Sequence, residues 1–367
     1  MPDTKGPLPP GSLIGIMGGG QLGRMLAIAA AQIGYRTHIF APEADGVAHE
    51  VASASTIAAY DDEMALNAFA NGCAVITYEF ENVPVDAVRY LQPHRACYPS
   101  AKVLSVAQDR VAEKSFAREL GVPVADFAEV RSEADLNAAL ASIGTPAILK
   151  TATEGYDGKG QARITNAAQG MAAWDSIGHG RAVLERMVRF DGEFSVILAR
   201  STHGETVFWD CPENIHADGI LSRSLIPARP EIARHAEAAV GHALRIADAL
   251  DYVGVLACEF FATDDGPLFN EMAPRVHNSG HWTIEGAVTS QFENHIRAIC
   301  GLPLGSTALT GASVEMHNII GPDVDRWHDY LADKDCRLHL YGKGHGRAGR
   351  KMGHATWVRH APGADQA

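Results

Sequence analysis

The sequence predicts a protein of combined α/β and α+β class, in which a parallel-sheet unit is followed by units built from hairpins. Two observations support this. Short apolar runs alternate with helical stretches in roughly the first hundred residues, which is typical of parallel strands joined by crossover helices. Later strand-like segments follow one another across Gly-rich or Asp-Gly turns, which indicates antiparallel hairpins. The length of 367 residues allows two or three domains.

The first unit reads as strand, Gly-rich turn and helix. The apolar run Leu13 to Met17 is followed at once by GGGQLGRM and then by LAIAAAQIG, with Gly34 as the expected helix stop. A second strand is predicted at Thr37–Phe40 and a third at Ala74–Tyr78, which leads into EFENVP. This unit is expected to end at about residue 108.

The next segment changes character. AQDRVAEKSFARELGVPVADFAEV predicts a charged helix ending at Gly121 and then an extended piece broken by Pro123. TPAILKTATEGYDGKGQARIT predicts a strand, a Gly-rich loop and a returning strand. RAVLERMVRFDGEFSVILAR predicts two strands around an acidic turn at Asp191 and Gly192.

A helix is predicted over residues 231–250, where apolar positions recur at helical spacing. GVLACEFFATDDGPLFNEMAPR follows and predicts a hairpin with DDG as its turn. From about residue 305, GASVEMHNIIG and CRLHLYGK are strand-like, and GRAGRKMGH comes after them.

Composition excludes several classes of protein. The net charge of -13 disfavours a nucleic-acid partner, so any anionic substrate must be held by local groups. No apolar run approaches the roughly 18 residues needed to cross a bilayer. The start, MPDTKGPLPPGS, lacks a signal-peptide core and is expected to be a flexible leader. The six cysteines form no CxxC pair, which disfavours a zinc site or a disulfide framework and fits a reducing cytoplasm.

Gly18, Gly20 and Gly23 follow the first strand at the spacing of a dinucleotide fingerprint. Glycines there let backbone N–H groups and a helix N-terminus approach a phosphate. An NAD site also needs an acidic residue at the end of the second strand, but Glu43 comes late and after a proline. The pattern therefore favours a monophosphate over NAD, and a Gly-rich turn that only packs is the alternative.

Lys150 closes a predicted strand and is followed by the loop 154–161, EGYDGKGQ. A lysine beside a flexible glycine loop suits a nucleotide, because it supplies a point charge and bare backbone donors for phosphate oxygens. The loop lacks the GK[ST] of a Walker motif. A solvated hairpin turn is the alternative.

Glu259 and Glu271 stand on the two arms of the predicted hairpin, each among apolar neighbours. Two such carboxylates repel one another unless a cation lies between them. Mg²⁺ bridging the carboxylates and ATP phosphates explains the pair, and separate pairing with arginines is the alternative.

The dense polar run 273–282, APRVHNSGHW, is expected to face a substrate. Arg275 suits a phosphate or carboxylate, and His277 can hydrogen-bond or carry a proton near neutral pH. Trp282 is expected to pack beneath the loop, with His281 as a second candidate for packing there. The late cluster of Arg347, Arg350 and Lys351 predicts an anion site, against the alternative of a solvated tail.

In this order, GGGQLGRM, TYEFENVP, EGYDGKGQ, NEMAPRVHNSGHWT and GRKMGH resemble the N5-carboxyaminoimidazole ribonucleotide synthase family of ATP-grasp enzymes. The resemblance covers nearly the whole chain, and APRVHNSGHW is its most specific string. It implies an N-terminal Rossmann-like pre-ATP-grasp domain at 1–108 and a two-lobed ATP-grasp domain at 109–304, with a nucleotide-binding lobe at about 123–188. A small β-rich C-terminal domain at 305–367 follows.

The resemblance also implies roles for individual residues. The implied ATP-binding residues are Arg110, Lys150, Gly155, Tyr156, Asp157, Gly158, Lys159, Gly160, Gln161, Glu185, Arg186, Met187, Val188, Glu193, His216, Asn270 and Glu271. Among these, 185–188 would read the adenine edge through the backbone and Glu193 would take the ribose hydroxyls. Glu259 and Glu271 would hold Mg²⁺. The implied catalytic residues are Tyr156, Arg275, His277 and Lys351. The implied ribonucleotide-binding residues are Gly20, Gln21, Leu22, Glu79, Asn278 and Arg350.

By this resemblance the protein would use ATP and Mg²⁺ to carboxylate aminoimidazole ribonucleotide with bicarbonate through carboxyphosphate, as a cytoplasmic homodimer without nucleic-acid or membrane partners. The nearest alternative is a formate-dependent glycinamide ribonucleotide transformylase, which shares the nucleotide and metal chemistry. Outside that pair stand a biotin carboxylase, an NAD-dependent dehydrogenase and a non-catalytic nucleotide-binding module.

Overall fold

The computed structural model describes residues 6–153 and 160–361 and contains three sheets, with orders β3-β2-β1-β4, β5-β8-β6-β7 and β14-β13-β9-β11-β12-β15-β17-β16. In the third sheet, β10 pairs with β9 as an additional strand. No helix within the described ranges is long and apolar enough to cross a membrane. The mixed α/β and α+β class predicted from the sequence is confirmed.

The first sheet is parallel throughout, as predicted. Its strands are β1 (Leu13–Met17), β2 (Arg36–Ala41), β3 (Ala54–Ile57) and β4 (Val75–Tyr78). Its helices are α1 (Gln21–Gln32), α2 (Glu63–Gly72), α3 (Val85–Leu91) and α4 (Ala101–Ala107). The strand β3 was not predicted from the sequence, because this edge strand alternates between half-buried and exposed residues and lacks an apolar run.

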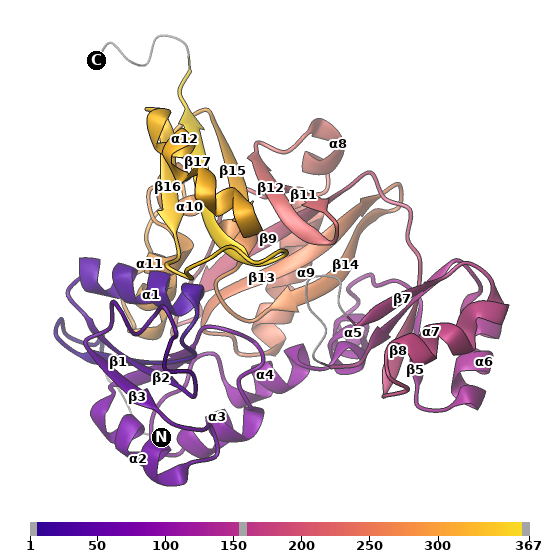
Figure 1. Ribbon diagram of the computed structural model, residues 1–367, viewed down its shortest axis with the longest axis horizontal. Coiled ribbons are helices and arrows are strands. Elements are labelled where there is room, and N and C mark those ends of the chain that lie inside the picture. The colour runs from indigo at the N-terminus through magenta and orange to yellow at the C-terminus, as the bar shows by residue number, and fades with distance from the viewer. Residues whose placement is uncertain (1–5, 154–159, 362–367) are drawn as a thin grey trace.

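A small lobe is built on the second sheet, which is antiparallel. It contains β5 (Phe127–Val130), α6 (Glu133–Ile143), β6 (Ala147–Thr151), β7 (Gln161–Ile164), a 3₁₀ turn (Ala167–Gln169), α7 (Gly170–Ser176) and β8 (Ala182–Arg186). Figure 1 shows this lobe standing to one side of the rest of the molecule, with α5 (Arg110–Glu119) leading into it. The strand, loop and returning strand predicted around Lys150 are β6 and β7.

The third sheet forms the body of the molecule (Figure 1). Its strands are β9 (Gly192–Arg200), β10 (Thr206–Phe208), β11 (Glu213–Ala217), β12 (Ile220–Ile226), β13 (Gly254–Thr263), β14 (Gly266–Ala273), β15 (Ser313–Ile320), β16 (Cys336–Leu340) and β17 (Lys351–Arg359). The helices around it are α8 (Pro230–Ala233), α9 (Ala236–Ala249), α10 (Thr283–Gly286), α11 (Gln291–Ile299) and α12 (Trp327–Ala332), with 3₁₀ turns at Asn278–Gly280 and Gly321–Arg326. Because β12 pairs with β15, the C-terminal strands extend the central sheet and do not form a sheet of their own.

The two strands predicted around Asp191 are confirmed as β8 and β9. They belong to different sheets, so the connection between them is a crossover from the small lobe to the body. A second expectation about this region was wrong in detail. The helix predicted over 231–250 is broken into α8 and α9 at Arg234 and His235, where Nη2 of Arg234 reaches Oδ2 of Asp191 at 3.4 Å.

The N-terminal domain is packed firmly on the body. Leu26 of α1 and Ile296 of α11 are both fully buried in one hydrophobic cluster, which also contains Trp282. The prediction that Trp282 packs beneath its loop is therefore confirmed, and His281 beside it is 1% exposed. Burial of such large apolar side chains across the junction fixes the domain's position over the face of the third sheet.

Candidate active site

The carboxylate pair is set by the register of the β13–β14 hairpin, in which Glu259 lies directly opposite Glu271. A β-bulge follows between Glu259 and Phe260, a feature that commonly re-aims side chains near active sites. Burial and the charge of Glu271 raise the pKa of Glu259 above its usual range. Oε1 of Glu259 lies 3.3 Å from Nε2 of His277, so its partner here is a histidine.

Two further carboxylates approach Glu271 from other elements. Burial and then the charge of Glu271 raise the pKa of Glu113 in α5, whose Oε1 accepts a 2.6 Å hydrogen bond from the Met272 N–H. The same two causes raise the pKa of Glu193 in β9 to about 7. Glu113 was not predicted as a site residue, because its sequence neighbours indicate only a charged position on an exposed amphipathic helix. Mutual repulsion among these acids makes the site favourable for a divalent cation.

Lysines lie beside the acids at the entrance to the small lobe. Nζ of Lys150 lies 3.1 Å from Oε2 of Glu185, as the resemblance would place a phosphate-binding lysine on β6. Lys114, which the sequence reading missed, is only 2% exposed, and its Nζ lies 3.3 Å from the same Oε2 and donates to the Asn270 carbonyl at 2.9 Å. Burial alone would raise the pKa of Glu185, but the two lysines outweigh it and hold that pKa below its usual range.

These contacts reduce the number of residues in 185–188 that are available to hydrogen-bond adenine. The Glu185 side chain is committed to the two lysines, and the residue pairs with β5 and β6. The N–H groups of Arg186 and Met187 donate to the Asp126 and Pro146 carbonyls at 2.8 and 3.1 Å. Both are therefore used to hold the lobe together and cannot serve as adenine donors, whereas Val188 lies beyond these bonds.

The loop expected to cover the phosphates is described only at its ends. Five of its predicted residues lie outside the described residues, namely Gly155, Tyr156, Asp157, Gly158 and Lys159. Gly160 has φ +68°, and its carbonyl accepts from the Thr151 N–H at 2.8 Å, while Gln161 pairs with Lys150. Arg110 lies at the base of this loop, where its Nη1 donates to the Thr151 carbonyl at 3.0 Å.

A second group of cations acts on Glu259. The Arg275 guanidinium forms an ion pair with Glu81, and Lys351 of β17 also lowers the pKa of Glu81. Burial, Arg275 and Lys351 together hold the pKa of His277 well below its ordinary value, so the ring is neutral near pH 7. The structure thus brings Arg275, His277 and Lys351 together beside Glu259, although Lys351 comes from a distant strand.

The Gly-rich turn differs from the expectation of a phosphate bound at its backbone. Glu79 already accepts from the Gly20 N–H at 2.8 Å and the Gly23 N–H at 3.2 Å, so a protein carboxylate occupies the N-terminus of α1. The Leu22 side chain is 6% exposed and belongs to the core, so any contact of this residue with substrate would be made by its backbone. Gln21 begins α1 beside this occupied turn.

The remaining predicted residues, His216, Asn278 and Arg350, differ in their surroundings. Nδ1 of His216 lies 3.2 Å from Oε2 of Glu193, so the two implied nucleotide contacts are neighbours. Both amide atoms of Asn278 are buried, and neither has a hydrogen-bond partner among the described residues. Arg350 is exposed and its Nη1 donates to the Lys343 carbonyl at 3.4 Å, and none of the contacts of the described residues joins it to the acidic group.

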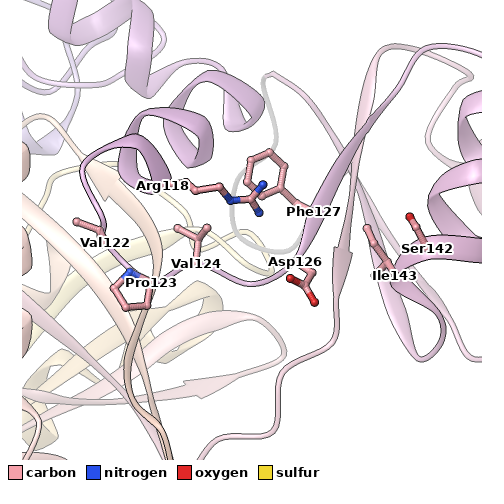
Figure 2. A pocket seen from close by; sticks show the side chains of 8 residues that line it. All are labelled: Arg118, Val122, Pro123, Val124, Asp126, Phe127, Ser142 and Ile143. Carbon is pink, nitrogen blue, oxygen red and sulfur yellow. The ribbon is translucent and has the colours of Figure 1, made fainter.

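A surface groove of about 530 Å³ lies where α5 leads into the small lobe. Figure 2 shows Arg118 beside Phe127 in this groove, and the Arg118 Cζ lies 4.1 Å from the Phe127 ring centroid. None of the residues lining the groove is among those predicted for nucleotide, metal or ribonucleotide, so the groove lies outside the candidate active site.

Three family models match successive parts of the chain. A ribonucleotide synthetase preATP-grasp domain matches residues 12–108, an ATP-grasp domain residues 115–292, and a phosphoribosylaminoimidazole carboxylase C-terminal domain residues 315–364.

Full-length relatives agree with the family models. An N5-carboxyaminoimidazole ribonucleotide synthase of Brucella melitensis is 49% identical and covers 97% of this chain and 98% of its own. One of Bacillus subtilis is 43% identical, with 95% and 92% covered. Among solved structures, an ADP complex of N5-carboxyaminoimidazole ribonucleotide synthetase superposes with a TM-score of 0.92 at 41% identity, covering 98% of this chain and 95% of that one. The Aspergillus clavatus synthase with ADP and 5-aminoimidazole ribonucleotide has a TM-score of 0.87 at 28% identity, with 95% and 94% covered.

Proposed function

Because the chain belongs to the N5-carboxyaminoimidazole ribonucleotide synthase family of ATP-grasp enzymes, we propose that it joins bicarbonate to the amine of 5-aminoimidazole ribonucleotide. The reaction converts ATP to ADP and phosphate and yields N5-carboxyaminoimidazole ribonucleotide for purine biosynthesis. The observation that carries the proposal is the opposition of Glu259 and Glu271, with two lysines at the neighbouring Glu185 and with Arg275 and Lys351 acting on Glu259. The alternative of a formate-dependent transformylase is not favoured by the relatives, which are named as carboxyaminoimidazole synthases.

The first half of the reaction takes place between the small lobe and the acidic pair. A bicarbonate oxygen attacks the γ-phosphorus of ATP, the bond to the β–γ bridging oxygen breaks, and ADP leaves carboxyphosphate behind. Lys150 and Arg110, at the base of the 154–161 loop, bind the phosphates and offset their charge. Glu193 and His216 hold the ribose, and the backbone beyond β8 contacts adenine.

Glu259 and Glu271 fit Mg²⁺, because the cluster of repelling carboxylates offers the oxygen ligands that this ion prefers. Among the described residues, no group of three or more histidine, cysteine, aspartate or glutamate side chains is placed to hold a metal ion by itself. Phosphate oxygens and water would have to complete the shell of an ion held by the two glutamates. When bound, the ion neutralises phosphate charge during transfer.

The second half of the reaction uses the residues around His277. The exocyclic amine attacks the carbon of carboxyphosphate, or of the CO₂ released from it. The bond from that carbon to the phosphate oxygen breaks, and the departing phosphate takes the proton that the amine loses. Arg275 and Lys351 hold the anionic groups, and neutral His277 hydrogen-bonds one of them. Tyr156 and the rest of the 154–161 loop exclude water from this short-lived species. Asn278 offers a buried amide to the ribonucleotide.

We further propose that the protein is a cytoplasmic homodimer, as the family resemblance implies. Light scattering coupled to size exclusion tests the homodimer, and a mass near that of one chain would contradict it. Fractionation of cells tests the cytoplasmic location.

The activity is tested by measuring ADP release with MgATP while aminoimidazole ribonucleotide and bicarbonate are added separately and together. Turnover that requires the ribonucleotide, rises with bicarbonate and yields an acid-labile carboxylated product is the expected result. Formate in place of bicarbonate is the matched comparison. Folded, ATP-binding protein that shows no dependence on the ribonucleotide would contradict the assigned substrate.

A further inference from the structure

A row of buried polar side chains extends from His277 across the third sheet. Oγ of Ser279 lies 2.8 Å from Nδ1 of His277 and 2.7 Å from Oγ of Ser195. Nδ2 of Asn214 donates to Oγ of Ser195 at 3.1 Å, and Oγ of Ser224 donates to Oδ1 of Asn214 at 2.9 Å. The three serines are 0% exposed and Asn214 is 5% exposed, so water does not compete for these bonds.

Strand register explains why these residues meet. Ser195 of β9 pairs with Glu259 of β13, and Asn214 of β11 pairs with Ser224 of β12. Neighbours in register point to the same face of a sheet, so the row lies on the face that carries Glu259. Figure 1 shows β9, β11 and β12 side by side in the third sheet.

The donors and acceptors give the row a direction. An amide nitrogen only donates, so Ser195 accepts from Asn214 and has its own hydrogen left for Ser279. Ser279 then donates its hydroxyl hydrogen to Nδ1 of His277. The backbone N–H of Ser279 also donates to Nδ1, at 3.3 Å, and a backbone N–H can donate a hydrogen bond but cannot accept one. A ring nitrogen that accepts from this N–H must be unprotonated. The Ser279 hydroxyl, whose bond to Nδ1 could otherwise run in either direction, is therefore the donor.

Gln291 holds the same histidine through its backbone. Its Oε1 accepts from the His277 N–H at 2.9 Å, and its Nε2 donates to the His277 carbonyl at 2.7 Å. With the backbone clamped and Nδ1 held, the ring keeps Nε2 directed at Oε1 of Glu259, 3.3 Å away.

We infer that Asn214, Ser195 and Ser279 form a hydrogen-bond relay that holds His277 in the tautomer protonated on Nε2, so that His277 serves the reaction as a hydrogen-bond donor and not as a base. Asn214, Ser195 and Ser279 are positioning residues, since they act only through His277. The catalytic consequence rests on the proposed carboxylation, whereas the tautomer is a property of the enzyme without substrates.

The experiment combines ¹⁵N NMR of histidine rings with steady-state kinetics. The spectrum of His277→Gln identifies the His277 signals among those of the 17 histidines by their loss. In the wild-type enzyme we expect a protonated, pyrrole-like Nε2 and an unprotonated, pyridine-like Nδ1. In Ser195→Ala and Ser279→Ala we expect both signals to move toward averaged values as the second tautomer becomes populated.

In the kinetic arm, both variants should lower kcat about tenfold and change the KM for ATP less than about twofold, with rates normalised to ATP-binding sites. Ser201→Ala is the matched control, because Ser201 is a 2% exposed serine just beyond β9 whose hydroxyl bonds only to a local turn in the hydrogen bonds described. It should leave kcat and the His277 signals unchanged.

A wild-type proton on Nδ1 would overturn the relay, and so would Ser195→Ala and Ser279→Ala variants that match Ser201→Ala in both readouts. The wild-type spectrum decides the tautomer even where a variant fails to fold. An enzyme with the expected tautomer but no ribonucleotide-dependent turnover would support the relay and contradict the proposed function.

Discussion

His295 joins the N-terminal domain to the body through two hydrogen bonds of its buried ring. Nε2 lies 2.9 Å from Oγ1 of Thr77 in β4, and Nδ1 accepts from the Val255 N–H of β13 at 3.1 Å. Because the backbone N–H can only donate, Nδ1 is unprotonated and Nε2 carries the hydrogen that Thr77 accepts. Protonation of Nδ1 would break the bond to β13 and place a charge in the core.

This arrangement predicts a pH-dependent stability. Burial lowers the pKa of His295 from 6.5 to about 3 in the folded protein. As the pH falls, the histidine therefore binds a proton in the unfolded chain before it does so in the folded protein. The contribution of His295 to the free energy of unfolding is complete above about pH 6.5 and is lost progressively as the pH falls toward 3. Between pH 6.5 and 5 the loss amounts to about 2 kcal/mol.

Thermal unfolding as a function of pH measures this effect. His295→Gln should unfold at a lower temperature at pH 7.5 and show a shallower decline in Tm toward pH 5. His203→Gln is the control, because His203 is exposed on a turn. Equal slopes for wild type and His295→Gln would assign the pH dependence to other groups.

Glu259→Gln is expected to separate activity from stability. Loss of a magnesium ligand should lower kcat at least 100-fold and raise the Mg²⁺ concentration needed for half-maximal ADP release. Relief of repulsion from Glu271 should stabilise the fold by about 1 kcal/mol, as strained functional sites often permit. Kinetics and thermal unfolding on the same preparation test both effects. Glu237→Gln, an exposed change on α9, should alter neither.

Lys114→Met should be strongly destabilising, because it removes one of two lysines that neutralise the buried Glu185. Breaking a buried ion pair from one side costs about 3 kcal/mol. Glu185→Gln in the same chain should recover part of that loss. Denaturant unfolding of the two single variants and the double variant gives the coupling energy. Strictly additive losses would show that Lys114 and Glu185 do not stabilise one another.

Gly20→Ala tests the occupied N-terminus of α1. A Cβ at Gly20 would lie 2.5 Å from Oε1 of Glu79, so the carboxylate must move and about 1–3 kcal/mol of stability is lost. Gly241→Ala is the matched control, since no atom lies within 4 Å of a Cβ built in that α9 position. This second change should stabilise the protein by about 0.5–1 kcal/mol. Unfolding of both variants in urea compares them, and a neutral Gly20→Ala would show that Glu79 is not held tightly.

Much of the candidate site was predictable wherever local sequence carries the geometry. The turn DDG sets the hairpin, and the hairpin's register puts Glu259 opposite Glu271. Lys150 at the end of its strand likewise needed only local pattern. The Gly20 region shows the limit of this approach, because the same glycine pattern suits a bound phosphate or a protein carboxylate. In the structure the Gly20 N–H donates to Glu79, 59 residues away, and no local pattern predicts that contact.

The sequence alone determined the strand, turn and helix elements, the hairpin that carries the acids, and the family resemblance, because each depends on side chains that are close along the chain. Only the tertiary structure decided that Glu113 and Lys114 of α5 line the acidic site and that the charge of Lys351 of β17 acts on His277. It also decided that Ser195 and Asn214 stand behind His277. Contacts between residues so far apart in the sequence depend on which strands pair and which helix faces are buried. Strand pairing and helix burial are in turn set by the packing of the whole chain.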